Sequence, residues 1–173
     1  MTVDSPAGDR PPNRQHDRLP RLVLFEPDIP QNTGTLMRMA ACLGIGLDII
    51  EPCGFVLDDR RLRRAAMDYI DRLDWRRFRS WRAYQETGHS GRLLGLTSGG
   101  DTCYTDFSFA AGDRLLVGRE SAGLPADVLA QADARLRIPI AAPMRSLNVA
   151  IAAAMVSGEA IRQIAAATGA DGS

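Results

Sequence analysis

The chain has 173 residues, 45% of them hydrophobic, and its 21 basic and 21 acidic residues give a formal net charge of zero. This length and composition suit one globular domain with its own core and exclude wholesale disorder. The longest apolar run, residues 149–156, is much shorter than the roughly 20 residues that a membrane-spanning helix needs, so we expect no membrane partner.

The cysteines and histidines are too few and too scattered for a zinc site or a disulfide framework. Cys42, Cys53 and Cys103 lie far apart, without a CxxC pair, and the chain has only two histidines. Residues 1–20 also lack the apolar stretch of a secretory signal. These features predict a metal-free protein of the reducing cytoplasm.

The chain divides into a domain and two short ends. Residues 1–20 hold four prolines and few apolar side chains, which predicts a disordered tail. One domain is expected at 21–167, followed by a flexible end at 168–173. In chain order, the patterning predicts a strand at 22–25, a helix at 33–43, a strand at 47–50, helices at 58–69 and 75–86, strands at 93–96 and 115–117, a short helix after Pro125, a strand at 136–138 and a last helix at 146–167.

Short strands that alternate with helices predict an α/β domain with a mostly parallel sheet and helices on both faces. Ligands of such sheets bind at the carboxyl ends of the strands. Three loops at these ends stand out: TSGG at 97–100, GRESAGLP at 118–125 and PIAAPMRSLN at 139–148. We therefore expect these loops to build the ligand site.

Several common chemistries lack their motifs. The one close GxG pair, Gly44 and Gly46, follows a predicted helix instead of the first strand, so it suits a helix C-cap and not a dinucleotide site. The chain contains no lysine, which excludes a P-loop, and it has no GxSxG turn for a hydrolase nucleophile. The sequence thus argues against an NAD-dependent oxidoreductase, a P-loop NTPase and an α/β hydrolase.

The segment at 25–38, FEPDIPQNTGTLMR, joins the first predicted strand to a helix. Asn32 or Thr33 can cap this helix, and Arg38 lies about 200° around it from Leu36, away from the apolar face. A helix N-terminus with a nearby arginine is favourable for phosphate. A capped helix with a solvent-exposed arginine remains the alternative.

Arginines are concentrated in one part of the chain. Nine lie between residues 60 and 82, opposed there by Asp68, Asp71 and Asp74. A local arginine surface on a neutral protein suits a polyanionic partner. Two solvated helix faces would give the same composition, so both interpretations stay open.

Three motifs follow one another along the chain: FEPDIPQNTGTLMR at 25–38, GRESAGLP at 118–125, and IP at 138–139 with RSLN at 145–148. Together they resemble the SPOUT class of RNA 2′-O-ribose methyltransferases over nearly all of the ordered chain. The run EPCGF at 51–55, followed by DDRRLRRAAMDY at 58–69, is similar to the small tRNA enzymes of this class, which methylate the wobble nucleotide, cytidine or uridine 34.

This resemblance implies a sheet whose C-terminal part forms a deep trefoil knot, with loops that bind S-adenosylmethionine. It implies transfer of the methyl group to a ribose 2′-hydroxyl of tRNA. Arg38 matches the arginine that the class places at that hydroxyl, where we expect it to orient the ribose and neutralise charge. Carried over by position, the cofactor-binding residues are Leu96, Gly118, Ile138 and Ser146, and the further catalytic positions are Asn32, Glu120 and Asn148. Glu120 would orient Arg38 or a loop, Ser146 would bind the cofactor or cap the last helix, and Asn148 would hold substrate or the knot.

The class dimerises around the knot, so we expect a twofold homodimer in which Arg38 of one subunit completes the site of the other. Contacts to tRNA are expected from Arg60, Arg61, Arg63, Arg64 and Tyr69. Two alternatives remain: a sister enzyme that acts on another tRNA nucleotide or on rRNA, and a knotted RNA-binding protein without catalysis. Arg119, which replaces a proline usual in the wobble enzymes, keeps the first alternative open.

Overall fold

In the computed structural model, residues 18–57, 69 and 72–169 are described. The predicted helix at 58–69 lies almost wholly outside them, as do most of the two predicted chain ends. The elements in chain order are β1 (Arg21–Phe25), α1 (Pro30–Leu43), β2 (Gly46–Ile50), β3 (Trp75–Phe78), α3 (Trp81–Gln85), β4 (Leu93–Leu96), β5 (Thr102–Cys103), the 3-10 helix η3 (Tyr104–Asp106), β6 (Arg114–Val117), α4 (Ala126–Leu129), β7 (Ala134–Arg137) and α5 (Val149–Thr168).

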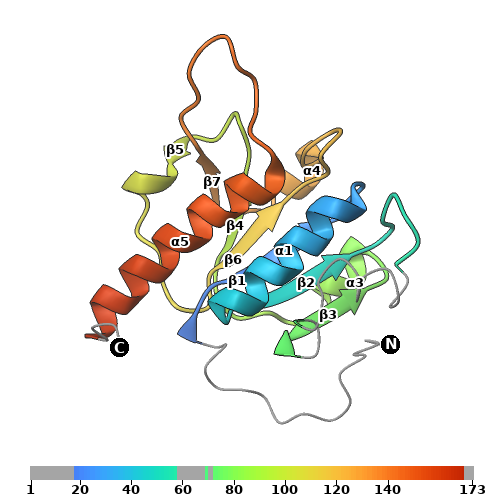
Figure 1. Ribbon diagram of the computed structural model, residues 1–173, viewed down its shortest axis with the longest axis horizontal. Helices are drawn as coiled ribbons and strands as arrows, with labels where there is room; N and C mark the ends of the chain where they lie inside the picture. Colours follow the sequence, from blue (N-terminus) through green and yellow to red (C-terminus); the bar gives the residue numbers. More distant parts are fainter. Residues whose placement is uncertain (1–17, 58–68, 70–71, 170–173) are drawn as a thin grey trace.

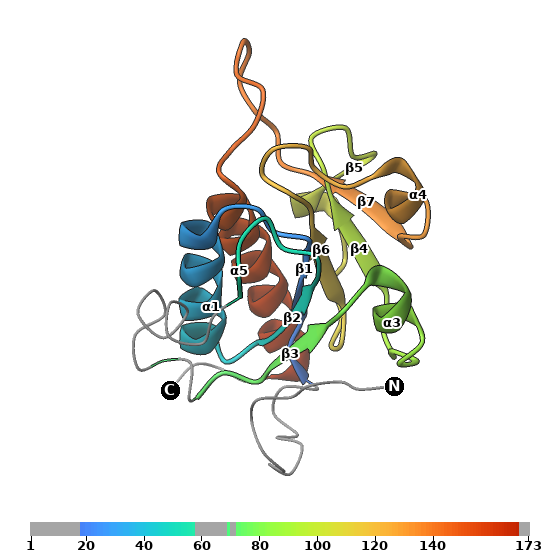
Figure 2. The same ribbon diagram turned by 90° about the vertical axis from the view of Figure 1, so that its right-hand side faces the viewer.

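The described strands form one parallel sheet in the order β3-β2-β1-β6-β4-β7-β5 (Figure 1). Helices α1 and α5 cover one face, and α3 and α4 lie on the other (Figure 2). The predicted α/β class, with a parallel sheet and helices on both faces, is confirmed. The knot stays a prediction.

Alternating side chains of the strands build two apolar cores, one on each face. Leu22 and Leu24 of β1 pack into the core beneath α1 and α5, whereas Val23 and Phe25 pack into a smaller core with Tyr84 of α3. Because both faces are covered, the central strands are mostly apolar, as buried parallel strands usually are; Asp48 of β2 is the buried exception among the described strand residues.

The predicted helix at 75–86 is wrong in its first half. Residues 75–78 form the edge strand β3, and only Trp81–Gln85 is helical, with the Ser80 hydroxyl accepting a hydrogen bond from the Ala83 amide (3.1 Å). Parallel pairing with β2 places Arg76 beside Asp48. Arg76 binds Asp48 of β2, and Arg77 binds Glu51 just after β2. The arginines of this strand therefore pair with acids of the neighbouring strand and do not form a helix face.

The predicted cap at the start of α1 is wrong, and the predicted cap at its end is confirmed. The helix begins at Pro30 after Ile29, so neither Asn32 nor Thr33 is the N-cap; Pro30 suits this first position because its missing amide would have no helical partner. At the other end Gly44 is left-handed (φ 69°) and caps the helix, as predicted.

The helix α5 begins at Val149, later than expected, because the Asn148 side chain accepts a hydrogen bond from the Ala150 amide (2.8 Å) and caps it. Ser146 is therefore not the cap. With 20 residues and a mean hydropathy of 1.3, α5 is long and apolar enough to cross a membrane. One side of α5 packs against α1 and β6, with Ala153, Val156 and Ala160 buried.

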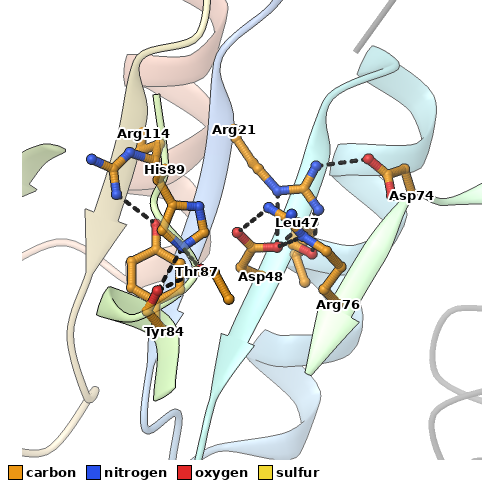
Figure 3. Close-up of polar contacts among 9 residues, drawn as sticks. All are labelled: Arg21, Leu47, Asp48, Asp74, Arg76, Tyr84, Thr87, His89 and Arg114. Atoms are coloured by element: carbon orange, nitrogen blue, oxygen red, sulfur yellow. Dashed lines mark hydrogen bonds and ion pairs between the residues drawn. The ribbon is translucent and has the colours of Figure 1, made fainter. Parts of the chain in front are cut away.

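A buried ion-pair group ties β1, β2 and β3 together on the α3 face (Figure 3). Asp48 of β2 has a fully buried side chain, and Arg21 Nε and Arg76 Nε both donate to its Oδ1 (2.8 and 2.9 Å). Arg21 also donates to Asp74 Oδ2 (2.7 Å). Beside this group the His89 ring stacks on Tyr84, with ring centroids 4.0 Å apart.

Replacing Asp48 with alanine is expected to lower the free energy of unfolding by about 3 kcal/mol, because two guanidinium groups lose their buried counter-charge. Urea denaturation followed by circular dichroism measures this change. Asp101, an exposed aspartate, is the matched control, and Asp101→Ala should be close to neutral. Equal stability of the two variants would contradict the structural role of Asp48.

Candidate active site

A cavity of about 650 Å³ opens at the carboxyl ends of β4, β6 and β7. Its walls come from the three loops that the sequence singled out, together with the first turns of α1 and α5. All four residues expected at the cofactor line it: Leu96, Gly118, Ile138 and Ser146. Residues from four separate parts of the chain thus meet in one hollow.

The loop after β6 folds back tightly on itself. Gly118 has no room for a side chain, because a Cβ there would lie 2.3 Å from the carbonyl carbon of Gly123 and 2.4 Å from the amide nitrogen of Leu124. Arg119 and Gly123 exchange two backbone hydrogen bonds (3.2 and 2.8 Å) that close the turn, and Gly123 is left-handed. The crowding at Gly118 therefore comes from the loop's own backbone, a reason that the sequence did not suggest.

Polar side chains gather on one wall of the cavity, and three of the predicted catalytic residues are among them. The side-chain Nδ2 of Asn148 donates a hydrogen bond to Asn32 Oδ1 (3.0 Å), and this bond joins the start of α5 to the first turn of α1. Glu120 lies in the same wall, and its Oε2 accepts a hydrogen bond from the backbone amide of Asp28 (3.1 Å). Asn32, Glu120 and Asn148 therefore form one cluster.

Asp28 fixes the loop after β6 to the loop after β1. Its Oδ1 accepts from the Glu120 amide (2.9 Å), and its Oδ2 accepts from both the amide and the hydroxyl of Ser121. The hydrogen bonding between the Asp28 and Glu120 side chains is the main reason that the pKa of Asp28 falls to about 2. Burial, followed by the contact with Asp28, raises the pKa of Glu120.

Sequence reasoning passed over Asp28 and Ser121, although both stand within the recognised motifs. The available signal was topological: β1 and β6 are neighbours in the sheet, so the loops that follow them must meet at the same edge. Glu26 and Arg119 form a second link between these two loops through an ion pair.

Arg38 is not part of this cluster. It is half-buried on α1 and does not line the cavity of its own chain. A helix rises about 1.5 Å per residue, so Arg38 lies about 9 Å farther along α1 than Asn32. Of the two orienting roles expected for Glu120, its hydrogen bonds with Asp28 favour the one toward a loop.

The expected RNA contacts are described only in part. Arg60, Arg61, Arg63 and Arg64 lie outside the described residues. Tyr69 is described, and 41% of its surface is exposed. It does not line the cavity.

Comparison with known proteins decides the family. The SpoU rRNA methylase family matches residues 20–158, which is most of the chain. The protein belongs to this family. One SpoU relative is a tRNA (cytidine(34)-2′-O)-methyltransferase from Beijerinckia indica, which is 56% identical over 149 residues, covering 84% of this chain and 92% of the relative.

Two solved structures share the fold at clear sequence identity. One concerns the 2-OH methylation of C/U34 on tRNA; it has a TM-score of 0.81 and 40% identity over 86% of this chain and 97% of that chain. The other is the SpoU methyltransferase AviRb from Streptomyces viridochromogenes in complex with the cofactor AdoMet, with a TM-score of 0.74 and 29% identity over 94% of this chain and 66% of that chain.

The cavity fits the cofactor of its SpoU relatives. Small-molecule sites are typically about 300–1,000 Å³ and combine apolar walls with a few polar groups. Here Leu96 and Ile138 supply apolar walls suited to an adenine ring. Thr97, Ser98 and Ser146 add hydroxyl groups around the same hollow.

Proposed function

We propose that this protein transfers a methyl group from S-adenosylmethionine to the ribose 2′-hydroxyl of the wobble nucleotide, position 34, of tRNA. The observation that carries the proposal is the cavity, which joins the three strand-end loops to the cluster of Asn32, Glu120 and Asn148. The names and subjects of the relatives support nucleotide 34 as the target. Such a reaction belongs to the cytoplasm, where tRNA is modified.

The cofactor supplies a methyl group activated by a positively charged sulfur, so the protein must mainly align the two reactants and manage a proton. Leu96, Gly118, Ile138 and Ser146 would hold the cofactor, largely through backbone groups and apolar contact. Asn32 and Asn148, already fixed by their mutual hydrogen bond, would orient the ribose. No metal enters this scheme.

Arg38 would act on the ribose and its phosphate. A guanidinium has a pKa above about 12 and stays charged, so it is suited to neutralise negative charge rather than to remove a proton. Since Arg38 does not line the cavity of its own chain, we propose that it reaches the cavity of a second copy. Arg60, Arg61, Arg63, Arg64 and Tyr69 would extend the tRNA surface, with the arginines bound to phosphates.

An exposed apolar stripe supports the second copy. Ile151 and Met155 are spaced by four residues in the first two turns of α5 and are 54% and 38% exposed, and Leu147, which precedes the helix, is 40% exposed. Residues with this spacing share one helix face, and exposed apolar patches on soluble domains mark contact surfaces. We propose that this face packs against its equivalent in a twofold homodimer.

A homodimer predicts twice the chain mass of 18.8 kDa in light scattering at micromolar concentration. Ile151→Arg should shift the protein toward monomers and reduce methyl transfer, because a charge at the centre of an apolar contact is costly to bury. Gln85→Arg, which adds the same charge at an exposed position of α3, is the control. A wild-type protein that is monomeric under these conditions contradicts the shared site.

The proposed function is tested with purified protein, radiolabelled S-adenosylmethionine and tRNA transcripts. Label should enter an intact transcript and should fail to enter one that carries 2′-deoxyribose at position 34. Equal labelling of both transcripts would exclude nucleotide 34 as the target and favour a sister enzyme. Labelling of ribosomal RNA alone would favour the rRNA alternative.

A further inference from the structure

The guanidinium group of Arg119 is held at one end and open at the other. Its Nη2 forms an ion pair with the carboxylate of Glu26, a residue just after β1 whose side chain is 14% exposed. The Arg119 side chain is 40% exposed and lines the cavity, whereas Glu26 does not line it. A guanidinium carries five N–H donors in a planar fork, so the contact with Glu26 leaves donors for a ligand in the cavity.

The backbone on both sides of this ion pair is fixed. Glu26 has a positive φ of 46°, a left-handed conformation that is uncommon outside glycine and that often marks a functional site. Its amide donates a hydrogen bond to the Ile50 carbonyl oxygen (2.9 Å). Across the contact, Arg119 exchanges two backbone hydrogen bonds with Gly123. The guanidinium group therefore faces the cavity from a preorganised frame.

Arg119 differs in its surroundings from the other cation of the cavity. Among the described residues that line the cavity, the basic ones are Arg119 and Arg145. Arg145 lies on the loop between β7 and α5, which is exposed throughout residues 141–148 and extends away from the sheet (Figure 1). Arg119 is half-buried, and attraction between charges is stronger where water is partly excluded. Arg119 is therefore the better partner for an anionic group of a bound ligand.

The cavity has an apolar end and a charged end. Leu96 ends β4 and Ile138 follows β7, and these two strands pair with each other. Arg119 follows β6 and contacts the residue after β1, and these strands pair as well. Neighbouring strands lie about 4.8 Å apart, so two spacings, roughly 10 Å, separate the two ends. S-adenosylmethionine has the same polarity, because its adenine and its charged amino acid group stand at opposite ends of the molecule.

We propose that Arg119 binds the carboxylate at the amino acid end of S-adenosylmethionine. This assignment rests on the proposed function and adds a charged contact to its cofactor site. With the adenine against the apolar walls, N–H groups of Arg119 on the carboxylate fix the other end of the cofactor, and with it the position of the sulfur between them. The same contact offsets the cost of bringing a carboxylate into a partly buried cavity.

Calorimetry with two ligands tests the assignment: S-adenosylhomocysteine and its decarboxylated analogue, which differ only in the carboxylate and carry no methyl group to transfer. Wild type should bind the first about 10-fold to 100-fold more tightly, the usual effect of a hydrogen bond to a charged group. Arg119→Gln should bind the two ligands with affinities within about threefold of each other. Damage to the loop would weaken both ligands alike, so the ratio of the two affinities separates a lost contact from a lost shape.

Arg145→Gln is the matched control, because it removes the same charge from the same cavity. It should keep the wild-type preference for the carboxylate. Binding of tRNA gives a second readout, since an arginine on a phosphate makes the affinity depend on salt. Arg119→Gln should keep the wild-type slope of tRNA affinity against salt concentration. A smaller slope with an unchanged carboxylate preference would assign Arg119 to a tRNA phosphate and overturn the proposal.

The assignment is also overturned by a wild type that binds both ligands equally, or by an Arg119→Gln variant that keeps the preference. If Arg119→Gln binds neither ligand, Arg119→Lys decides, because lysine keeps the charge but lacks the fork. Its carboxylate preference should fall below that of wild type, and an unchanged preference overturns the assignment. A wild type that prefers the carboxylate but labels no tRNA contradicts the proposed function instead, so the two failures are distinguishable.

Discussion

Gly118→Ala should reduce the affinity for S-adenosylmethionine by at least about 100-fold, which corresponds to about 2.8 kcal/mol. The added Cβ would lie 2.3 Å from the Gly123 carbonyl carbon, far inside van der Waals contact, and the obstacle is backbone that cannot rotate away. The loop must open, which breaks the two hydrogen bonds between Arg119 and Gly123 and displaces a wall of the cavity. Isothermal titration calorimetry measures the change.

Gly99→Ala is the control for Gly118→Ala. Gly99 belongs to another loop at the same edge of the sheet, and a Cβ there would meet nothing within 4 Å. This variant should bind the cofactor nearly as well as wild type. Tight binding by Gly118→Ala would show that the loop after β6 does not shape the cofactor site.

Arg38→Ala should slow methyl transfer by about 100-fold to 1,000-fold, the usual cost of removing one group that stabilises charge in a transition state. Its affinity for the cofactor should stay within a few fold of wild type, because Arg38 does not line the cavity of its own chain. Arg82→Ala, on an exposed face of α3, is the control and should keep full activity. Equal losses of transfer and cofactor binding would instead assign Arg38 to the cofactor site.

The same variant tests whether the site is shared between subunits. Arg38→Ala and Gly118→Ala are each expected to be inactive alone, but a mixed dimer would hold one site with an intact loop and an intact arginine. Random exchange of equal amounts should restore about a quarter of wild-type activity. No recovery after verified exchange would place Arg38 and the cofactor loops in one chain.

Much of the fold follows from local pattern in the sequence. The apolar runs of β1, β2, β4 and β6 are short and bounded by turn residues, and a fully covered parallel strand is apolar on both faces. The positions of the loops at the strand ends therefore follow from the sequence pattern alone. Leu96, Gly118, Ile138 and Ser146 meet in the cavity because these strands are parallel and present their carboxyl ends at one edge.

The parts that were missed depend on contacts between distant residues. The local sequence of β3 suited a helix with arginines on its surface. Its identity as a strand depends on β2, because Arg76 binds Asp48 of β2 and Arg77 binds Glu51 in the loop after β2. The role of Asp28 likewise depends on Glu120, which is 92 residues away in the chain. Asn148 was expected at the site, but its side-chain hydrogen bonds, to the start of α5 and to Asn32, require the positions of both helices.

Mapping of ribose methylation in tRNA from a strain that lacks this gene is the most direct test of the account. The account predicts that 2′-O-methylation at position 34 disappears in the deletion strain, returns with the wild-type gene and does not return with the Gly118→Ala gene. Methylation at position 34 that persists unchanged in the deletion strain would contradict the account.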